Sequence, residues 1–139
     1  MKNNKKLTAI LLLLIAVAIL AAFAIGCAKD EETEILPTTP VPSLTLDKLS
    51  YSPGEIMTVT FTALDTYESN AWVGIIPSHI AHGDEAVNDQ YDISYQYLNG
   101  MTAGTLTFSA PSAPGSYDMR MHDTDTNGNE VTSVSFTVN

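Results

Sequence analysis

Hydrophobic and polar residues alternate in short stretches from Ser43 to Asn139. The clearest stretch is EIMTVTFTA, in which Met57, Val59 and Phe61 would face a core and the threonines between them would face water. Because successive side chains of a strand point to opposite faces of its sheet, this period of two predicts strands with one buried face. About seven strands are predicted: SLTLD (43–47), EIMTVTFTA (55–63), AWVGIIP (71–77), YDISYQY (91–97), GTLTFSA (104–110), SYDMRMHD (116–123) and EVTSVSFTV (130–138).

Short strands of this kind, separated by turns such as Pro53–Gly54 and accompanied by no helical period, predict an all-β fold. Their number and spacing indicate a single immunoglobulin-like antiparallel β-sandwich. In that fold Trp72 would be the core tryptophan, and PGSY (114–117) would lead into the penultimate strand. The chain has one cysteine, so no disulfide can form within it, and the sandwich must be held together by packing.

The N-terminal segment has a different composition. MKNNKK, with three lysines, precedes an apolar run from Leu7 to Ile25 in which Thr8 is the only polar residue. A positive segment followed by an apolar one predicts a secretory signal, although a run of this length could also span a membrane as a helix. The sequence AIGC (24–27) resembles the lipobox of bacterial lipoproteins, with alanine at position 24 where leucine is usual.

The lipobox resemblance implies cleavage between Gly26 and Cys27 and a diacylglyceryl thioether on Cys27. Residues 1–26 would then be the signal peptide, and two or three acyl chains would anchor the protein on the outer face of the cell membrane, or facing the periplasm if the envelope is double. The alternative is an uncleaved signal anchor with a chance cysteine. Residues 27–42 carry four acids and three prolines without an apolar period, which predicts a disordered tether between the anchor and the domain at 43–139.

That domain carries a second resemblance. The series YSPGE, WVGIIP, FSAPSAPGSYDMRM and NGNEVTSVSFTV resembles immunoglobulin-like modules of bacterial secreted proteins. Such modules carry a Pro-Gly-Glu turn, a W-[VI]-G-[IL] strand and a P-G-x-Y-x-x-R strand, and a similar tryptophan strand occurs in SKICH-type domains of eukaryotic adaptors. One departure is the segment from Asn70 to Trp72, since an aspartate often precedes the tryptophan. The resemblance implies an accessory or binding unit and brings no catalytic set of residues with it.

The stretch HDTDTNGNEV, which begins at residue 122, looks like the first half of a calcium-binding loop. Asp123, Asp125 and Asn127 would offer oxygen ligands at alternate positions, and Gly128 would allow the turn. Such a loop needs a bidentate acid at its twelfth position, where this chain has Val134, a residue of a predicted strand. Asn-Gly is also the strongest short hairpin signal. We therefore interpret the stretch as a hairpin tip, with a weak extracellular calcium site as the alternative.

The long connection PSHIAHGDEAVNDQYD lies between two predicted strands. It could supply further calcium ligands from Asp84, Glu85 and Asp89. His79 and His82 beside these carboxylates could instead bind zinc, but their spacing favours a shared metal only on a helix. We interpret the segment as a polar connection, which is where a binding module would keep its function.

Tyrosines form a third candidate site. Tyr91, Tyr95 and Tyr97 share one face of a predicted strand with Ile93. Because an isoleucine lies among them, we interpret the row as the core face of that strand. The alternative is an exposed row that stacks on sugar rings, as in carbohydrate-binding modules.

The net charge of −10 argues against a nucleic-acid partner, and neither the G-x-S-x-G nor the H-E-x-x-H motif of hydrolases occurs. The single arginine, Arg120, is expected to form an ion pair on a sheet face. We therefore expect a membrane-anchored extracytoplasmic lipoprotein that displays a non-enzymatic module for an unknown protein or glycan ligand. The alternative is a calcium-dependent carbohydrate-binding or adhesion module. A third hypothesis, an enzyme accessory domain or metal-dependent hydrolase, would require a pocket that joins His79, His82 and His122.

Overall fold

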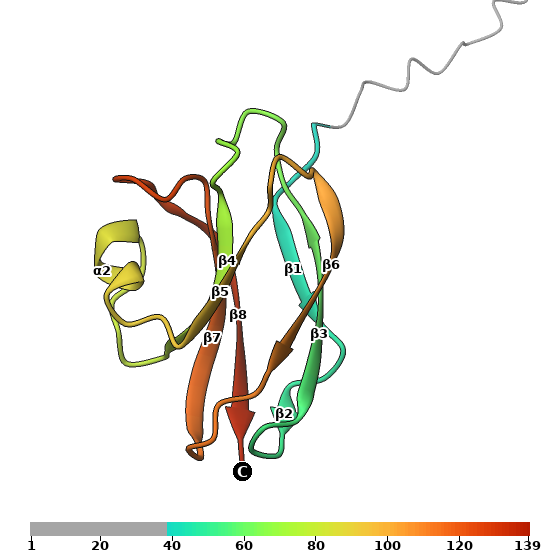
Figure 1. Ribbon diagram of the computed structural model, residues 1–139, viewed down its shortest axis with the longest axis vertical. Helices are drawn as coiled ribbons and strands as arrows, with labels where there is room; N and C mark the ends of the chain where they lie inside the picture. The colour runs from blue at the N-terminus through green and yellow to red at the C-terminus, as the bar shows by residue number, and fades with distance from the viewer. Residues whose placement is uncertain (1–38) are drawn as a thin grey trace, which may run out of the picture. The chain divides into compact units, whose positions relative to one another are not determined.

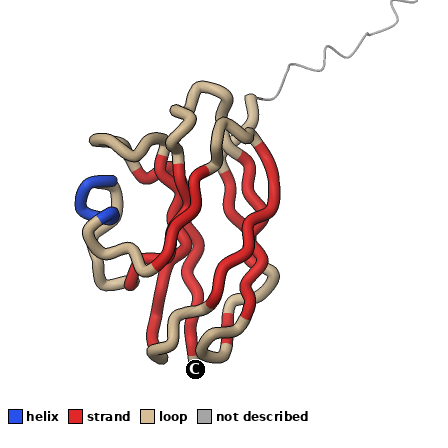
Figure 2. Tube along the Cα trace, in the orientation of Figure 1, coloured by secondary structure: helices blue, strands red, loops and turns tan. Residues whose placement is uncertain are grey.

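The computed structural model describes residues 39–139, so the predicted signal helix, Cys27 and most of the predicted tether lie outside the described residues. The described part is all-β, with two sheets that lie face to face and one short helix beside them (Figures 1 and 2). This confirms the prediction of an all-β fold. Among residues 39–139 there is no helix of the length and apolar character that crossing a membrane requires.

One sheet has three strands and the other has five. The order in the first sheet is β1 (Ser43–Leu46), β3 (Ile56–Thr62) and β6 (Ala103–Ser109). The order in the second sheet is β2 (Ser50–Tyr51), β8 (Glu130–Val138), β7 (Gly115–His122), β4 (Trp72–Pro77) and β5 (Ser94–Tyr97). The predicted strands are all present and pair antiparallel. The sequence pattern does not predict β2, which pairs in parallel with β8 and is too short to show a period.

The core lies between the two sheets and is built from alternate residues of their strands. On β3, Met57, Val59 and Phe61 are buried as predicted, while the threonines between them are exposed. On the opposite sheet Val73 of β4 pairs with Met121 of β7, and both belong to the same buried cluster. Apolar packing therefore joins the two sheets.

The five-stranded sheet is also covered on its other face. On β4, Trp72 and Ile76 alternate with the core residues and yet are buried too. The connection at residues 78–93, which contains the helix α2 (Glu85–Asp89), lies on this side of the sheet (Figure 1). Trp72 is buried, as expected of a core tryptophan, but it lies outside the cluster between the two sheets, because its side chain is on this outer face. There it stacks on His122, with ring centroids 4.2 Å apart.

The helix α2 is a second difference from the sequence analysis, which predicts no helix in this region. Asp84 caps the helix, since its carboxylate accepts a hydrogen bond of 3.0 Å from the main-chain N–H of Ala86. Its five residues are too few for a helical period to appear in the sequence. A helix this short has little stability of its own, so it depends on the contacts that hold the connection against the sheet.

Candidate binding site between two loops

A buried arginine holds the connection at residues 78–93 against the outer face of the five-stranded sheet. Arg120 lies on β7 and is fully buried. Its guanidinium donates hydrogen bonds to the carbonyls of Ile80 (2.9 Å) and Ala81 (3.0 Å) and to Oδ1 of Asn88 (2.6 Å). A planar guanidinium can do this because it presents several donors in fixed directions. The position of the connection is therefore set by β7.

Asp118 compensates the charge of Arg120. One of its carboxylate oxygens accepts a hydrogen bond of 2.7 Å from Arg120 Nη2, and the other accepts from the hydroxyls of Ser78 and Ser135. Burial raises the pKa of the Asp118 carboxyl, but the hydrogen bonds from these three partners outweigh it and hold the pKa below its usual value. The predicted ion pair of Arg120 is confirmed, and it lies buried beneath the connection.

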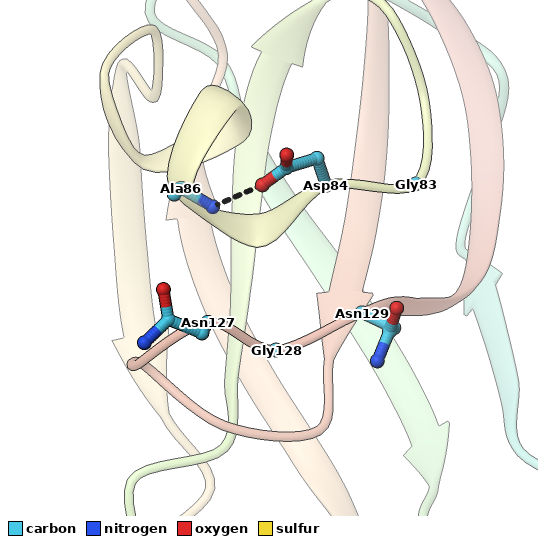
Figure 3. A pocket seen from close by; sticks show the side chains of 6 residues that line it. All are labelled: Gly83, Asp84, Ala86, Asn127, Gly128 and Asn129. Atoms are coloured by element: carbon cyan, nitrogen blue, oxygen red, sulfur yellow. Dashed lines mark hydrogen bonds between the residues drawn. The ribbon is translucent and has the colours of Figure 1, made fainter.

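The connection meets the loop between β7 and β8 through two main-chain hydrogen bonds. The N–H of Glu85 donates to the carbonyl of Gly128 (3.2 Å), and the N–H of Glu130 donates to that of Gly83 (3.0 Å). A cleft of about 410 Å³ opens at this junction (Figure 3). Its lining consists of Gly83, Asp84, Ala86, Asn127, Gly128 and Asn129. Asp84 is the one charged residue of this lining, and the two asparagines add side-chain amides.

The β7–β8 loop contains the stretch that resembles a calcium-binding loop. It connects two antiparallel strands as predicted, but it spans residues 123–129 and is not a tight two-residue turn. Asn127 has a positive φ of 54° and Gly128 does not, whereas the tight Asn-Gly turn requires positive φ at both residues. Asp123 closes the loop, because its Oδ1 accepts a hydrogen bond of 2.8 Å from the N–H of Asn129. A Cβ at Gly128 would lie 2.7 Å from that oxygen.

Three carboxylates from the two loops lie together. Glu85, Asp89 and Asp125 each offer an oxygen within 4.8 Å of the others, and we call them the carboxylate group. Burial raises the pKa of Glu85, which accepts a hydrogen bond of 3.4 Å from the N–H of Gly128. Burial also raises the pKa of Asp92, and the charges of Asp89 and Asp125 raise it further. The carboxylates therefore repel one another when they are charged, and a bound cation would relieve that repulsion.

The three predicted calcium ligands of the β7–β8 loop therefore do not lie together at one point. Asp125 belongs to the carboxylate group, whereas Asp123 closes its loop and Asn127 lines the cleft. The further ligands expected from the connection are present in Glu85 and Asp89. The sequence indicates which two loops carry the acids, but the packing of the loops decides which side chains converge.

The three histidines do not converge on the cleft. His79 is exposed, and His82 Nδ1 lies 2.7 Å from the carboxylate of Glu130. His122 is buried against Trp72. None of the three lines the cleft, and no histidine belongs to the group of potential metal ligands found between residues 39 and 139. The structure therefore does not bring the three histidines together at this cleft.

The tyrosine row lies on the surface, so the prediction that it fills the core is wrong. Tyr91, Ile93 and Tyr95 are 51%, 50% and 46% exposed. The row leads into the edge strand β5, which begins only at Ser94, and Tyr95 lies opposite Gly74 on the outer face of β4. Within β5 a period of two puts Tyr95 and Tyr97 on one face, and the pairing with β4 decides which face it is; Tyr91 and Ile93 precede the strand and are exposed beside it in the sequence. We call this surface the tyrosine face; it consists of Tyr91, Ile93, Tyr95 and Tyr97.

Trp72 supports the tyrosine face from within. Its ring meets that of Tyr95 edge to face at 6.0 Å, and Tyr95 meets Tyr97 in the same way at 5.3 Å. The hydroxyl of Tyr97 donates a hydrogen bond of 2.5 Å to Asp125, and this bond raises the pKa of Tyr97. Gly74 is required beneath the tryptophan, because a Cβ there would lie 2.5 Å from the Trp72 ring. The tyrosine face is thus linked to the carboxylate group.

No family model matches this chain, and neither a curated protein nor a solved structure shows significant similarity to it. The candidate site is therefore defined by the geometry of the described residues. It comprises a polar cleft, a group of three carboxylates and a half-exposed tyrosine face, all carried by two loops and the adjoining edge strand.

Proposed function

We propose that this chain is an exported lipoprotein whose β-sandwich is a non-enzymatic binding module. The observation that carries the proposal is the half-exposed tyrosine face, in which Tyr91 belongs to the connection at residues 78–93 and Tyr95 to the edge strand that follows it. Clustered apolar and aromatic side chains on a surface mark interaction sites. Tyrosine in particular supplies a large contact area at a low cost in conformational entropy.

The rigidity of this surface supports a binding role. Arg120 ties the connection to β7 through Ile80, Ala81 and Asn88. Trp72 lies beneath the tyrosines and is itself buried. A surface that is held in place before its ligand arrives loses less conformational entropy on binding.

The strand order supports an immunoglobulin-like topology. In the five-stranded sheet, β8, β7 and β4 are neighbours as strands G, F and C are in such folds, and β5 takes the place of the added edge strand of variable-type domains. Near the start of β7, the hydroxyl of Tyr117 donates a hydrogen bond of 2.8 Å to the carbonyl of Ala113. This bond corresponds to the tyrosine corner of those folds. The outer position of Trp72 is a departure from them.

The lipid anchor is proposed from the N-terminal sequence alone. The basic start, the apolar run and the AIGC segment that ends at Cys27 occur in the order that export and lipidation require. Residues 27–42 would then separate the binding module from the membrane surface.

The binding role is tested with the full chain purified in detergent and with envelope fragments of the producing cells from which lipid has been extracted. We expect the full chain to sediment with the fragments. A variant with both Tyr91→Ala and Tyr95→Ala should remain in the supernatant. Leu49→Ala is the matched control, because Leu49 is 59% exposed and lies between β1 and β2, outside the tyrosine face. Equal sedimentation of the double variant would contradict the proposal.

A calcium-dependent form of this module is the second candidate function. It is supported by the carboxylate group, in which Glu85 is buried and its pKa is raised by that burial. Carboxylate oxygens are the ligands that calcium prefers, and extracellular modules bind it with millimolar affinity. A calcium-dependent rise in melting temperature that requires Asp125 would support this form of the module.

A further inference from the structure

We infer that the ligand of the tyrosine face is an uncharged polysaccharide. Its sugar rings would stack on Tyr91 and Tyr95, and its hydroxyl groups would bond to the polar side chains of the cleft. This inference rests on the proposed binding function and names the chemical class of the ligand.

The charge of the described part disfavours anionic ligands. Lys48 and Arg120 are the only lysine or arginine residues between residues 39 and 139. Arg120 is fully buried, and Lys48 forms an ion pair with Glu55, so neither offers a free cation to the tyrosine face. The adjoining loops carry the carboxylate group instead. Polymers that bear phosphate or carboxylate groups would therefore be repelled.

A cationic polymer, as distinct from a metal ion, is disfavoured because several carboxylates near the tyrosine face are already engaged or buried. Asp125 accepts a hydrogen bond from the hydroxyl of Tyr97. Glu85 is buried, and Oδ1 of Asp84 caps α2, which leaves only its other carboxylate oxygen for a ligand. A cationic group gains most from an exposed and unengaged carboxylate, and within the carboxylate group only Asp89 is exposed. An uncharged ligand needs no such partner.

The tyrosine rings are held from one side and open on the other. Tyr95 stands edge to face against both Trp72 and Tyr97, which limits its rotation, while about half of its surface faces water. The flat C–H face of a pyranose ring packs on such an aromatic ring through dispersion and burial of apolar surface. Because Tyr91 offers a second exposed ring, the tyrosine face suits a chain of sugars better than a single unit.

The cleft supplies the hydrogen-bonding groups that sugar hydroxyls need. Asn127 and Asn129 bring amides that both donate and accept, and Asp84 brings a carboxylate that accepts (Figure 3). The cleft and the tyrosine face are connected, since Asp125 lies in the same loop as Asn127 and is bonded to Tyr97. An extended sugar chain could therefore contact both.

The test measures sedimentation of the full chain with insoluble cellulose and chitin, which are uncharged, and with poly-L-lysine coupled to agarose. We expect the full chain to bind one of the two polysaccharides equally in about 0.05 and about 0.5 M NaCl, because stacking is not screened by salt. Tyr91→Ala should weaken this binding about tenfold. Tyr91 forms none of the aromatic pairs seen in the described part, so its loss should leave the Trp72 region folded. Leu49→Ala should bind as the unchanged chain does.

Two results would overturn the inference in distinguishable ways. Salt-sensitive binding to poly-L-lysine without binding to either polysaccharide would show that the surface recognises cations. Envelope binding that survives periodate oxidation of sugars and is lost after protease treatment of the fragments would identify a protein ligand. In both cases the proposed binding function would stand and the ligand class would be wrong. If Tyr91→Ala changes neither polysaccharide nor envelope binding, the inference and the proposed binding function are both wrong.

Discussion

The guanidinium of Arg120 lies 2.6 Å from Oδ1 of Asn88, a residue 32 positions earlier in the chain, and both side chains are fully buried. Asn88 lies in α2 and also donates a hydrogen bond of 2.6 Å to the carbonyl of Asp84. The arginine therefore sets where α2 lies on the sheet. Because the cleft and the carboxylate group both include residues of this connection, Arg120 acts as a positioning residue for the candidate site.

Replacing Arg120 should destabilise the protein strongly. Arg120→Ala leaves the buried carboxylate of Asp118 without its cation, and loss of one partner of a buried ion pair costs about 3–5 kcal/mol. Urea unfolding of the full chain measures the change in the free energy of unfolding. Lys48→Ala is the matched control, since it breaks an exposed ion pair with Glu55, and such pairs contribute little to stability. A similarly small effect of both substitutions would show that Arg120 does not hold the connection.

A methyl group at Gly74 should disturb the tyrosine face from beneath. In Gly74→Ala the new Cβ would lie 2.5 Å from the Trp72 ring, so the ring must shift from its place against Tyr95, at a cost of about 1–3 kcal/mol. The chain has one tryptophan, and its fluorescence spectrum therefore reports this movement directly. In Gly115→Ala the new Cβ meets its nearest neighbour at 3.5 Å, and the spectrum should not change. A Gly74→Ala variant with the original spectrum would contradict the close contact.

Calcium should raise the melting temperature if the carboxylate group binds it. With a dissociation constant of ~0.5 mM and ~5 mM calcium, binding adds about 1.4 kcal/mol, or roughly 5–10 °C for a domain of this size. Asp125→Asn should abolish the rise. Asp123→Ala should lower the melting temperature through loss of its bond to Asn129, but it should leave the calcium-dependent rise intact. An unchanged melt of the full chain with calcium and with a chelator would exclude the calcium-dependent form.

Acid should destabilise the protein through His122. Burial is the main cause that lowers its pKa from 6.5 to about 4, and the charge of Glu130 offsets this only in part. Between these values the unfolded chain binds a proton that the folded chain does not, so the free energy of unfolding should fall as the pH decreases from about 6.5 to about 4. His122→Phe keeps a ring against Trp72 and removes this titration. Urea unfolding at several pH values should show a smaller decrease in the free energy of unfolding for the variant than for the unchanged chain. Equal decreases in the two proteins would argue against a buried neutral histidine.

Lipidation should depend on Cys27. Cells that express Cys27→Ser should incorporate no labelled fatty acid into the protein, because the thiol that forms the thioether is absent. Ala24→Leu restores the residue that is usual at that position of a lipobox, so labelling should be kept or increased. Labelling that persists in Cys27→Ser would show that the fatty acid is attached to another residue.

The strands could be predicted from the sequence because a period of two is a local signal. Met57, Val59 and Phe61 show it clearly, since only one face of β3 is buried. The period of two disappears on β4, because this strand is buried on both faces. Trp72 and Val73 are neighbours in the sequence and lie on opposite faces, yet both are buried. The connection that covers the outer face is polar and irregular, so nothing in its own sequence indicates that it packs against the sheet.

The candidate site also combines features that the sequence predicts with features that only packing decides. Spacing alone groups Asp123 and Asp125 in one loop, but the loop closes on Asp123 and directs Asp125 toward Glu85, 40 residues earlier in the numbering. Contacts between residues so far apart in the chain are not encoded in any local pattern. They appear only when both loops are fixed on the same sheet.

By itself, then, the sequence determined the all-β fold class and the main strands, because these depend on local periodicity. The signal and the tether are proposed from local composition alone. Only the tertiary structure decided that Trp72 and Tyr95 lie on the outer face, that Arg120 is buried beneath a connection, and that the carboxylate group forms. The physical reason is that burial and side-chain convergence are properties of how strands pair and loops pack. A residue pattern along one strand shows which side chains share a face, and the neighbouring elements determine what that face meets.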